Sequence, residues 1–89
     1  MEKLNHENYS ILSISQLAYL ITKDWRLQGK GINYGAKPYL EAMYSLNSVM
    51  DKYGDDSGQS IVAYFLSNAS TWKGEVAKGV KKELNKRIK

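Results

Sequence analysis

Basic residues gather at one end of this 89-residue chain, where they could dock onto an acidic surface. Residues 73–89 hold seven Lys or Arg against two Glu, a net charge of +5, whereas residues 1–72 hold six against seven Asp or Glu, a net of −1. The spacing predicts a basic amphipathic helix, and such asymmetry indicates an acidic partner surface or nucleic acid. We expect the contacts to come from Trp72, Lys73, Lys78, Lys82, Lys86 and Arg87.

The same lysines have a simpler explanation, a solvated helix face that keeps a small domain soluble and complements the helix C-terminus. Lysine also lacks the bidentate fork with which arginine recognises phosphates. Binding to a membrane surface is disfavoured, because Val76, Val80 and Leu84 on the other side of the helix have the character of a core face. Docking on protein and docking on nucleic acid both remain open.

A second set of candidates, Lys30, Tyr34 and Lys37, lies in a glycine-containing loop over residues 26–37. A loop that leads into a helix N-terminus can cradle an anion such as a small nucleotide. Its spacing fits neither the P-loop nor the dinucleotide fingerprint, and Pro38 removes one backbone donor. A plain connection is the simpler interpretation.

Residues for catalysis or metal binding are sparse. The chain has no cysteine, which excludes a Cys/His set, and its single histidine, His6, lies in the unpatterned N-terminal segment, so no Ser/His/Asp set is indicated. Asp51, Asp55 and Asp56 do not have the spacing of a calcium-binding loop, and helix termination and capping explain them. We therefore expect no enzymatic activity, no metal and no cofactor.

These residues must be positioned by a small domain. A hydrophobic fraction of 43% argues against disorder, and 89 residues suffice for one core. The N-terminus lacks the layout of a signal peptide, and the longest apolar run, Ile61 to Leu66, is too short to span a membrane. We expect a cytoplasmic protein without membrane contact.

Hydrophobic spacing predicts an all-α fold, a compact four-helix domain at 13–89 that follows a short N-terminal arm at 1–12. The helices are expected at about 13–25, 38–53, 56–68 and 71–88. Ser13 and Gln16 form a capping box for the first helix, and Gly54 is expected to end the second. Asp55, Asp56 or Ser57 would cap the third, and Ser70 or Thr71 the last. The core-facing stripe of the second helix would be Tyr39, Met43, Leu46, Met50 and Tyr53.

Several tyrosines fall outside these core stripes and are expected to be partly exposed, namely Tyr19, Tyr34, Tyr44 and Tyr64. Exposed tyrosines are enriched at protein–protein interfaces. Self-association into a homo-oligomer also fits, because a domain this small gains stability from it.

Three stretches, Asp24-Trp25, residues 35–43 and residues 57–75, resemble small proteins carried by bacteriophages and prophages. The resemblance covers residues 24 to about 84 and leaves the N-terminal arm unmatched. It implies no activity and no site residues. What it implies is a setting, because small phage proteins commonly bind host or defence macromolecules.

The sequence therefore predicts a non-enzymatic helical module that binds and modulates a host or anti-phage-defence protein in the bacterial cytoplasm. The alternative is a nucleic-acid-binding protein that sets its basic C-terminal helix against the phosphate backbone.

Overall fold

The computed structural model describes residues 6–29 and 31–89. In chain order the elements are the 3-10 turn η1 (His6–Ile11), α1 (Ile14–Leu27), the 3-10 turn η2 (Tyr34–Ala36), α2 (Lys37–Met43), β1 (Lys52–Tyr53), β2 (Asp56–Ser57), α3 (Gly58–Ser67) and α4 (Glu75–Arg87). The fold is predominantly helical, as expected, but it also contains a two-stranded sheet, so the all-α prediction holds only in its coarser form.

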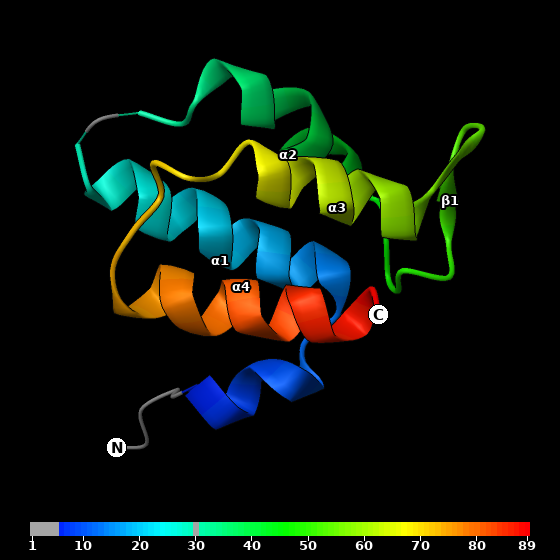
Figure 1. Ribbon diagram of the computed structural model, residues 1–89, viewed down its shortest axis with the longest axis horizontal. Coiled ribbons are helices and arrows are strands. Elements are labelled where there is room, and N and C mark those ends of the chain that lie inside the picture. The colour runs from blue at the N-terminus through cyan, green and yellow to red at the C-terminus, as the bar shows by residue number, and fades with distance from the viewer. Residues whose placement is uncertain (1–5, 30) are drawn as a thin grey trace.

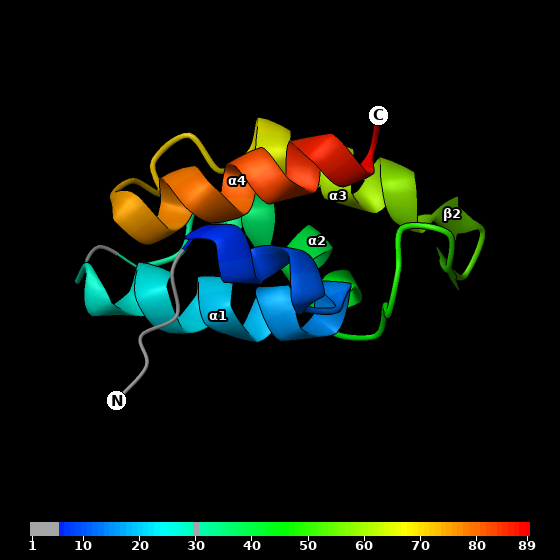
Figure 2. The same cartoon turned by 90° about the horizontal axis from the view of Figure 1, so that it is seen from below.

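The helices pack side by side around one core. Helices α1 and α4 run in opposite directions next to each other (Figure 1), and on one side of this pair α2 packs on α1 and α3 packs on α4. Turn η1 lies across the edge where α1 and α4 meet (Figure 2). The β-hairpin projects at one end of the molecule, and residues 28–29, 31–33 and 68–74 lie at the other (Figure 1).

Helix α1 begins where its local sequence predicts. The Ser13 hydroxyl accepts from the Gln16 N–H at 3.1 Å, and the Gln16 side chain accepts from the Ser13 N–H at 2.8 Å. This capping box satisfies backbone donors that a helix N-terminus leaves unpaired. Ser57 caps α3 in a related way, accepting from the Ser60 N–H at 3.1 Å.

Helix α2 ends at Met43, although the sequence predicted a helix as far as residue 53. The carbonyl groups that a longer helix would use are engaged elsewhere. The Leu46 carbonyl accepts from the Ser15 N–H at 2.7 Å, and the Asn47 carbonyl accepts from the Ile14 N–H at 3.1 Å. The segment after Met43 thus completes the N-terminus of α1 instead of continuing α2.

The hairpin replaces the rest of the predicted second helix. Lys52 pairs with Ser57, and Tyr53 pairs with Asp56 across a two-residue turn. Gly54 has a φ of +63°, as the first central residue of a tight hairpin turn requires, so it does not end a helix. Met50 and Tyr53, which the predicted stripe placed in the core, are therefore exposed, at 85% and 47%.

Helix α4 begins later than predicted, at Glu75, and neither Ser70 nor Thr71 caps it. Gly74 occupies the cap position with a φ of +110° and gives no side-chain hydrogen bond. Residues 68–74 instead form a loop that carries the Trp72 side chain into the core.

The described part of the expected N-terminal arm, residues 6–12, is packed onto the domain. Turn η1 contacts α4, and the Tyr9 side chain is buried. Burial raises the pKa of Tyr9, and the nearby charges of Asp24 and Glu75 add to the effect. The described part of the arm therefore contributes Tyr9 to the core, a role that the sequence did not predict.

The core is centred on three aromatic side chains, Trp25, Phe65 and Trp72. The two tryptophan rings stack with centroids 5.8 Å apart and an interplanar angle of 17°. Around them lie the apolar faces of the helices, including Ile14, Leu17, Ile21, Met43, Leu46, Val62, Val80 and Leu84.

Candidate binding surface

Helix α4 presents Lys78, Lys82 and Lys86 to solvent, and Lys89 is exposed just beyond its C-terminal end; we call these four lysines the lysine face. A spacing of three or four residues sets side chains above one another on the same side of a helix. The opposite side of α4 buries Ala77, Val80 and Leu84. The sequence predicted this division, and the structure confirms it.

The lysine face is not neutralised within the part of the chain that the structure describes. Among the described residues, Arg87 and Glu83 form an ion pair on α4, with Nε and Oε2 2.7 Å apart. This pair includes no lysine of the face. Like charges four residues apart destabilise a helix by about 0.2–0.5 kcal/mol per pair. Lys78 with Lys82 and Lys82 with Lys86 are two such pairs, and an anionic partner would relieve their repulsion.

Arg87 was predicted as a contact residue, but it holds the molecule together. Its Nε donates to Glu83, and its Nη2 donates to the carbonyl groups of Tyr9 at 3.0 Å and Ser10 at 3.2 Å. The guanidinium thus fastens η1 to the last turn of α4. The structure assigns it to this clamp and not to the lysine face.

Trp72 was also predicted to lie on the contact surface, and this was wrong, because its side chain is fully buried. Its indole Nε1 donates to Asp24 Oδ2 at 2.9 Å, which satisfies the one polar atom of the ring. The same carboxylate accepts from Gln28 Nε2 at 3.2 Å. Trp72 therefore fixes the loop before α4 and offers no ring to a partner.

Lys81 lies at the border of the lysine face but is turned inward. Its Nζ donates to the carbonyl groups of Ala69 and Trp72, both at 2.7 Å, and lies 5.7 Å from the centroid of the Trp72 ring. Burial lowers the pKa of Lys81, and repulsion by Lys73 lowers it further. The residue pattern of the helix did not indicate this role, because the carbonyl groups that Lys81 contacts belong to the preceding loop.

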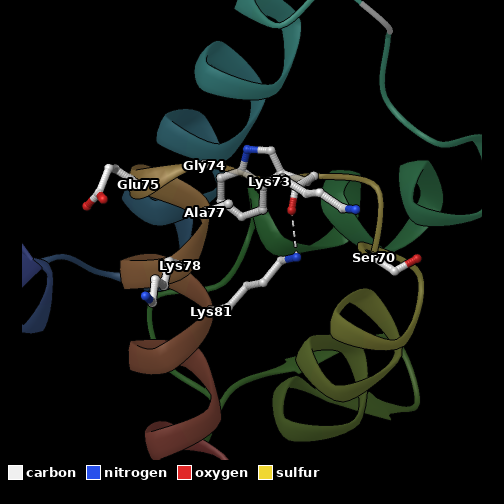
Figure 3. Close-up of a pocket in the computed structure, with 8 residues that line it drawn as sticks. Ser70, Lys73, Gly74, Glu75, Ala77, Lys78 and Lys81 are labelled. Carbon is white, nitrogen blue, oxygen red and sulfur yellow. Dashed lines mark hydrogen bonds between the residues drawn. The ribbon is translucent and has the colours of Figure 1, made fainter.

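A shallow depression of about 580 Å³ lies beside the first turn of α4. Figure 3 shows Lys81 reaching across it, with Ser70 and Lys73 on one side and Glu75 and Lys78 on the other. Lys73 and Lys78 are exposed. The depression therefore connects Lys73 to the lysine face. Lys73 and the four lysines of the face form one basic surface.

The loop candidates lie elsewhere. Lys30 is outside the described residues, whereas Tyr34 is 86% exposed and Lys37 is exposed. Turn η2 packs on α2 and α3, while α4 packs on η1, α1 and α3. Turn η2 and helix α4 therefore pack on partly different elements and share contact with α3.

The glycine loop is also packed more closely than a flexible connection would be. Asn33 Nδ2 donates to the Asn68 carbonyl at 2.9 Å. A Cβ atom on Gly35 would lie 2.7 Å from Asn68 Oδ1, so the absence of a side chain there serves contact with the end of α3. This observation explains Gly35 without an anion.

The tyrosines outside the core stripes are exposed as predicted: Tyr19 at 65%, Tyr34 at 86% and Tyr64 at 55%. Tyr44 is half-buried, stacks on Tyr19 and hydrogen-bonds through its hydroxyl to Thr22. Sequence reasoning missed Tyr53, which it placed in the core. The Tyr-Gly-Asp-Asp order at 53–56 is a hairpin signal that could have corrected this.

Within residues 6–29 and 31–89, no group of three or more His, Asp or Glu side chains is arranged to hold a metal ion. None of the helices described combines the length and the apolar character needed to cross a membrane. Comparison with protein families, with characterised proteins and with solved structures finds no match to this chain.

Proposed function

We propose that this protein is a non-enzymatic binding module that docks onto an acidic surface of a macromolecular partner through the lysine face and Lys73. The observation that carries the proposal is a row of lysines on a well-packed helix that no carboxylate neutralises among the residues that the structure describes. In the phage setting that the sequence resemblance implies, the partner is a host or anti-phage-defence protein.

The rigidity of α4 supports this proposal. Its apolar side is held in the core, and Arg87 and Lys81 fasten it to η1 and to the preceding loop. A preformed surface loses little conformational entropy when it binds, apart from that of the lysine side chains. Charges arranged in this way chiefly raise the rate of association with an acidic partner and select against basic ones.

Charge reversal tests the proposal. The triple variant Lys78→Glu, Lys82→Glu, Lys86→Glu should lose the protein partners that the wild-type chain captures from nuclease-treated bacterial lysate. The matched control reverses three exposed lysines outside α4, Lys23, Lys37 and Lys52, and changes the net charge equally. Capture that survives in the lysine-face variant as well as in the control would overturn the proposal.

Nucleic-acid binding is the second candidate, because the same lysines could neutralise phosphates along a duplex or a single strand. For duplex DNA, the logarithm of the binding constant would fall with the logarithm of salt concentration by about 0.9 per phosphate neutralised. Anisotropy of a labelled mixed-sequence duplex and of a single strand, at low and physiological salt, measures this slope. Tight and salt-steep binding that the triple reversal abolishes would favour this candidate over a protein partner.

A further inference from the structure

A second surface lies between α2, the hairpin and α3, and none of its lining residues belongs to α4. It is a groove of about 600 Å³ whose sides are formed by Pro38, Tyr39, Tyr53 and Tyr64. Its floor is formed by Ala42 and Ile61, which are buried. We call it the tyrosine groove.

The rings of this groove are accessible and partly preordered. Tyr39 and Tyr64 lie with their ring centroids 5.4 Å apart and their planes inclined by 35°. Tyr64 is 55% exposed and Tyr53 is 47% exposed, so large aromatic faces meet water at the groove walls. Such rings supply contact area at low entropic cost and carry a hydroxyl group for hydrogen bonding.

The charge of the groove rim is acidic, in contrast to the lysine face. Asp56 lines the groove, and Asp55 lies beside it in the hairpin turn; both are exposed. The described residues pair neither carboxylate with a cation. Lys52 on the neighbouring strand offsets one of the two charges. The rim therefore disfavours a phosphate backbone and favours a ligand that carries a positive charge.

The size of the groove suits a short segment of chain. Clefts of about 300–1,000 Å³ hold ligands of drug size. A second copy of this chain would instead need a face of about 800 Å² per partner for a stable dimer.

We propose that the tyrosine groove binds an extended proline-rich segment of a partner protein, with an arginine or lysine beside the prolines. Polyproline II segments dock in aromatic-lined grooves because they are already extended and keep their carbonyl groups free to accept hydrogen bonds. Pyrrolidine rings would pack against Tyr39 and Tyr64, tyrosine hydroxyls would donate to the peptide carbonyls, and Asp56 would pair with the basic residue.

The test uses the full chain and a panel of labelled ten-residue peptides that carry Pro-x-x-Pro with an arginine at either flank. Fluorescence anisotropy should detect binding by at least one member, with a loss of about tenfold or more in Tyr64→Ala, which is about 1.4 kcal/mol. The control, Tyr34→Ala, removes a still more exposed tyrosine that does not line the groove and should leave the affinity unchanged. Asp56→Lys should weaken binding of the arginine peptide but not of its arginine-free counterpart.

This proposal can fail independently of the one for α4. The triple lysine-face variant should bind the peptides as the wild type does. The proposal is overturned if no member of the panel binds below about 1 mM. Equal weakening of peptide binding by Tyr34→Ala and Tyr64→Ala would also overturn it. So would sedimentation experiments in which the chain self-associates through the groove.

Discussion

At the scale of single residues, side chains that look suited to a surface hold the core and its borders together. Trp72 is buried because Asp24 accepts from its indole N–H, so that the ring enters the core without an unsatisfied donor. Lys81 lays its aliphatic stem along the protein while its ammonium group reaches two loop carbonyls. The residue types alone did not reveal these roles, since each depends on a partner from another segment.

We expect Lys81→Met to destabilise the fold by about 1–2 kcal/mol. The variant keeps most of the stem but removes the donor to the carbonyls of Ala69 and Trp72. Hydrogen bonds to charged groups contribute about 1.5–3 kcal/mol, and partial exposure of Lys81 reduces that figure. Urea unfolding followed by tryptophan fluorescence measures the effect. Lys82→Met, on the exposed side of the same helix, should change stability by less than about 0.5 kcal/mol.

The pH dependence of stability, compared between the wild type and Lys81→Met, gives a second check on the role of Lys81. Its folded-state pKa lies below the unfolded value of 10.5, so the unfolded chain binds more protons between the two values. The free energy of unfolding then rises with pH in that window. The stability of the wild type relative to Lys81→Met should therefore increase as pH rises from neutral toward 10.5. A difference that shrinks over this range would show that the ammonium group is not desolvated.

At the scale of elements, local signals predicted the starts of α1 and α3, but they predicted neither the start of α4 nor the end of α2. Ser13 and Ser57 act through residues three positions away, so the sequence around them contains the complete cap. Helix α2 ends early because of partners far away in the sequence: the carbonyls of Leu46 and Asn47 accept from Ser15 and Ile14 at the start of α1. The apolar stripe of residues 39–53 has helical spacing, but these long-range hydrogen bonds outweigh it.

The connection from α2 to α3 depends on Gly58. A Cβ atom at this position would lie 2.9 Å from the Val49 carbonyl oxygen and 3.0 Å from that of Asp51. These are backbone atoms, which cannot move aside as a flexible side chain would. We expect Gly58→Ala to cost about 1–3 kcal/mol, the usual range for overpacking in a buried site. Thermal unfolding measures the change, and Lys52→Ala in the exposed strand should be nearly neutral. A Gly58→Ala variant as stable as Lys52→Ala would contradict the close approach.

At the scale of the whole molecule, the two candidate surfaces differ in how far the sequence predicted them. The lysine face follows from the period of one helix, so residues 73–89 sufficed to predict its four lysines and their exposure. The tyrosine groove needs Pro38 and Tyr39 from α2, Tyr53 from the hairpin and Tyr64 from α3. Tyr64 was expected to be exposed, but only the packing of three elements brings these residues together.

Segments near the two ends of the chain, η1 and the last turn of α4, are held together. Tyr9 is buried against the domain, and Arg87 donates to the carbonyls of Tyr9 and Ser10 across 78 and 77 residues of sequence. This clamp holds η1 on the side of α4 that adjoins the lysine face. If the clamp opened, the apolar surface around Tyr9 and one edge of α4 would become exposed together.

We therefore expect Arg87→Met to loosen η1 first and to destabilise the whole fold by about 1–2 kcal/mol, since charge-assisted hydrogen bonds to two carbonyls are lost. For a domain of this size each kcal/mol lowers Tm by about 4–8 °C. Hydrogen exchange should show faster exchange of the Leu12 amide, which donates to the Tyr9 carbonyl, than of the amides within α3. Lys86→Met removes a neighbouring charge without touching the clamp and is the matched control. An unchanged Tm in Arg87→Met would mean that the burial of Tyr9, and not the guanidinium, holds η1 against α4.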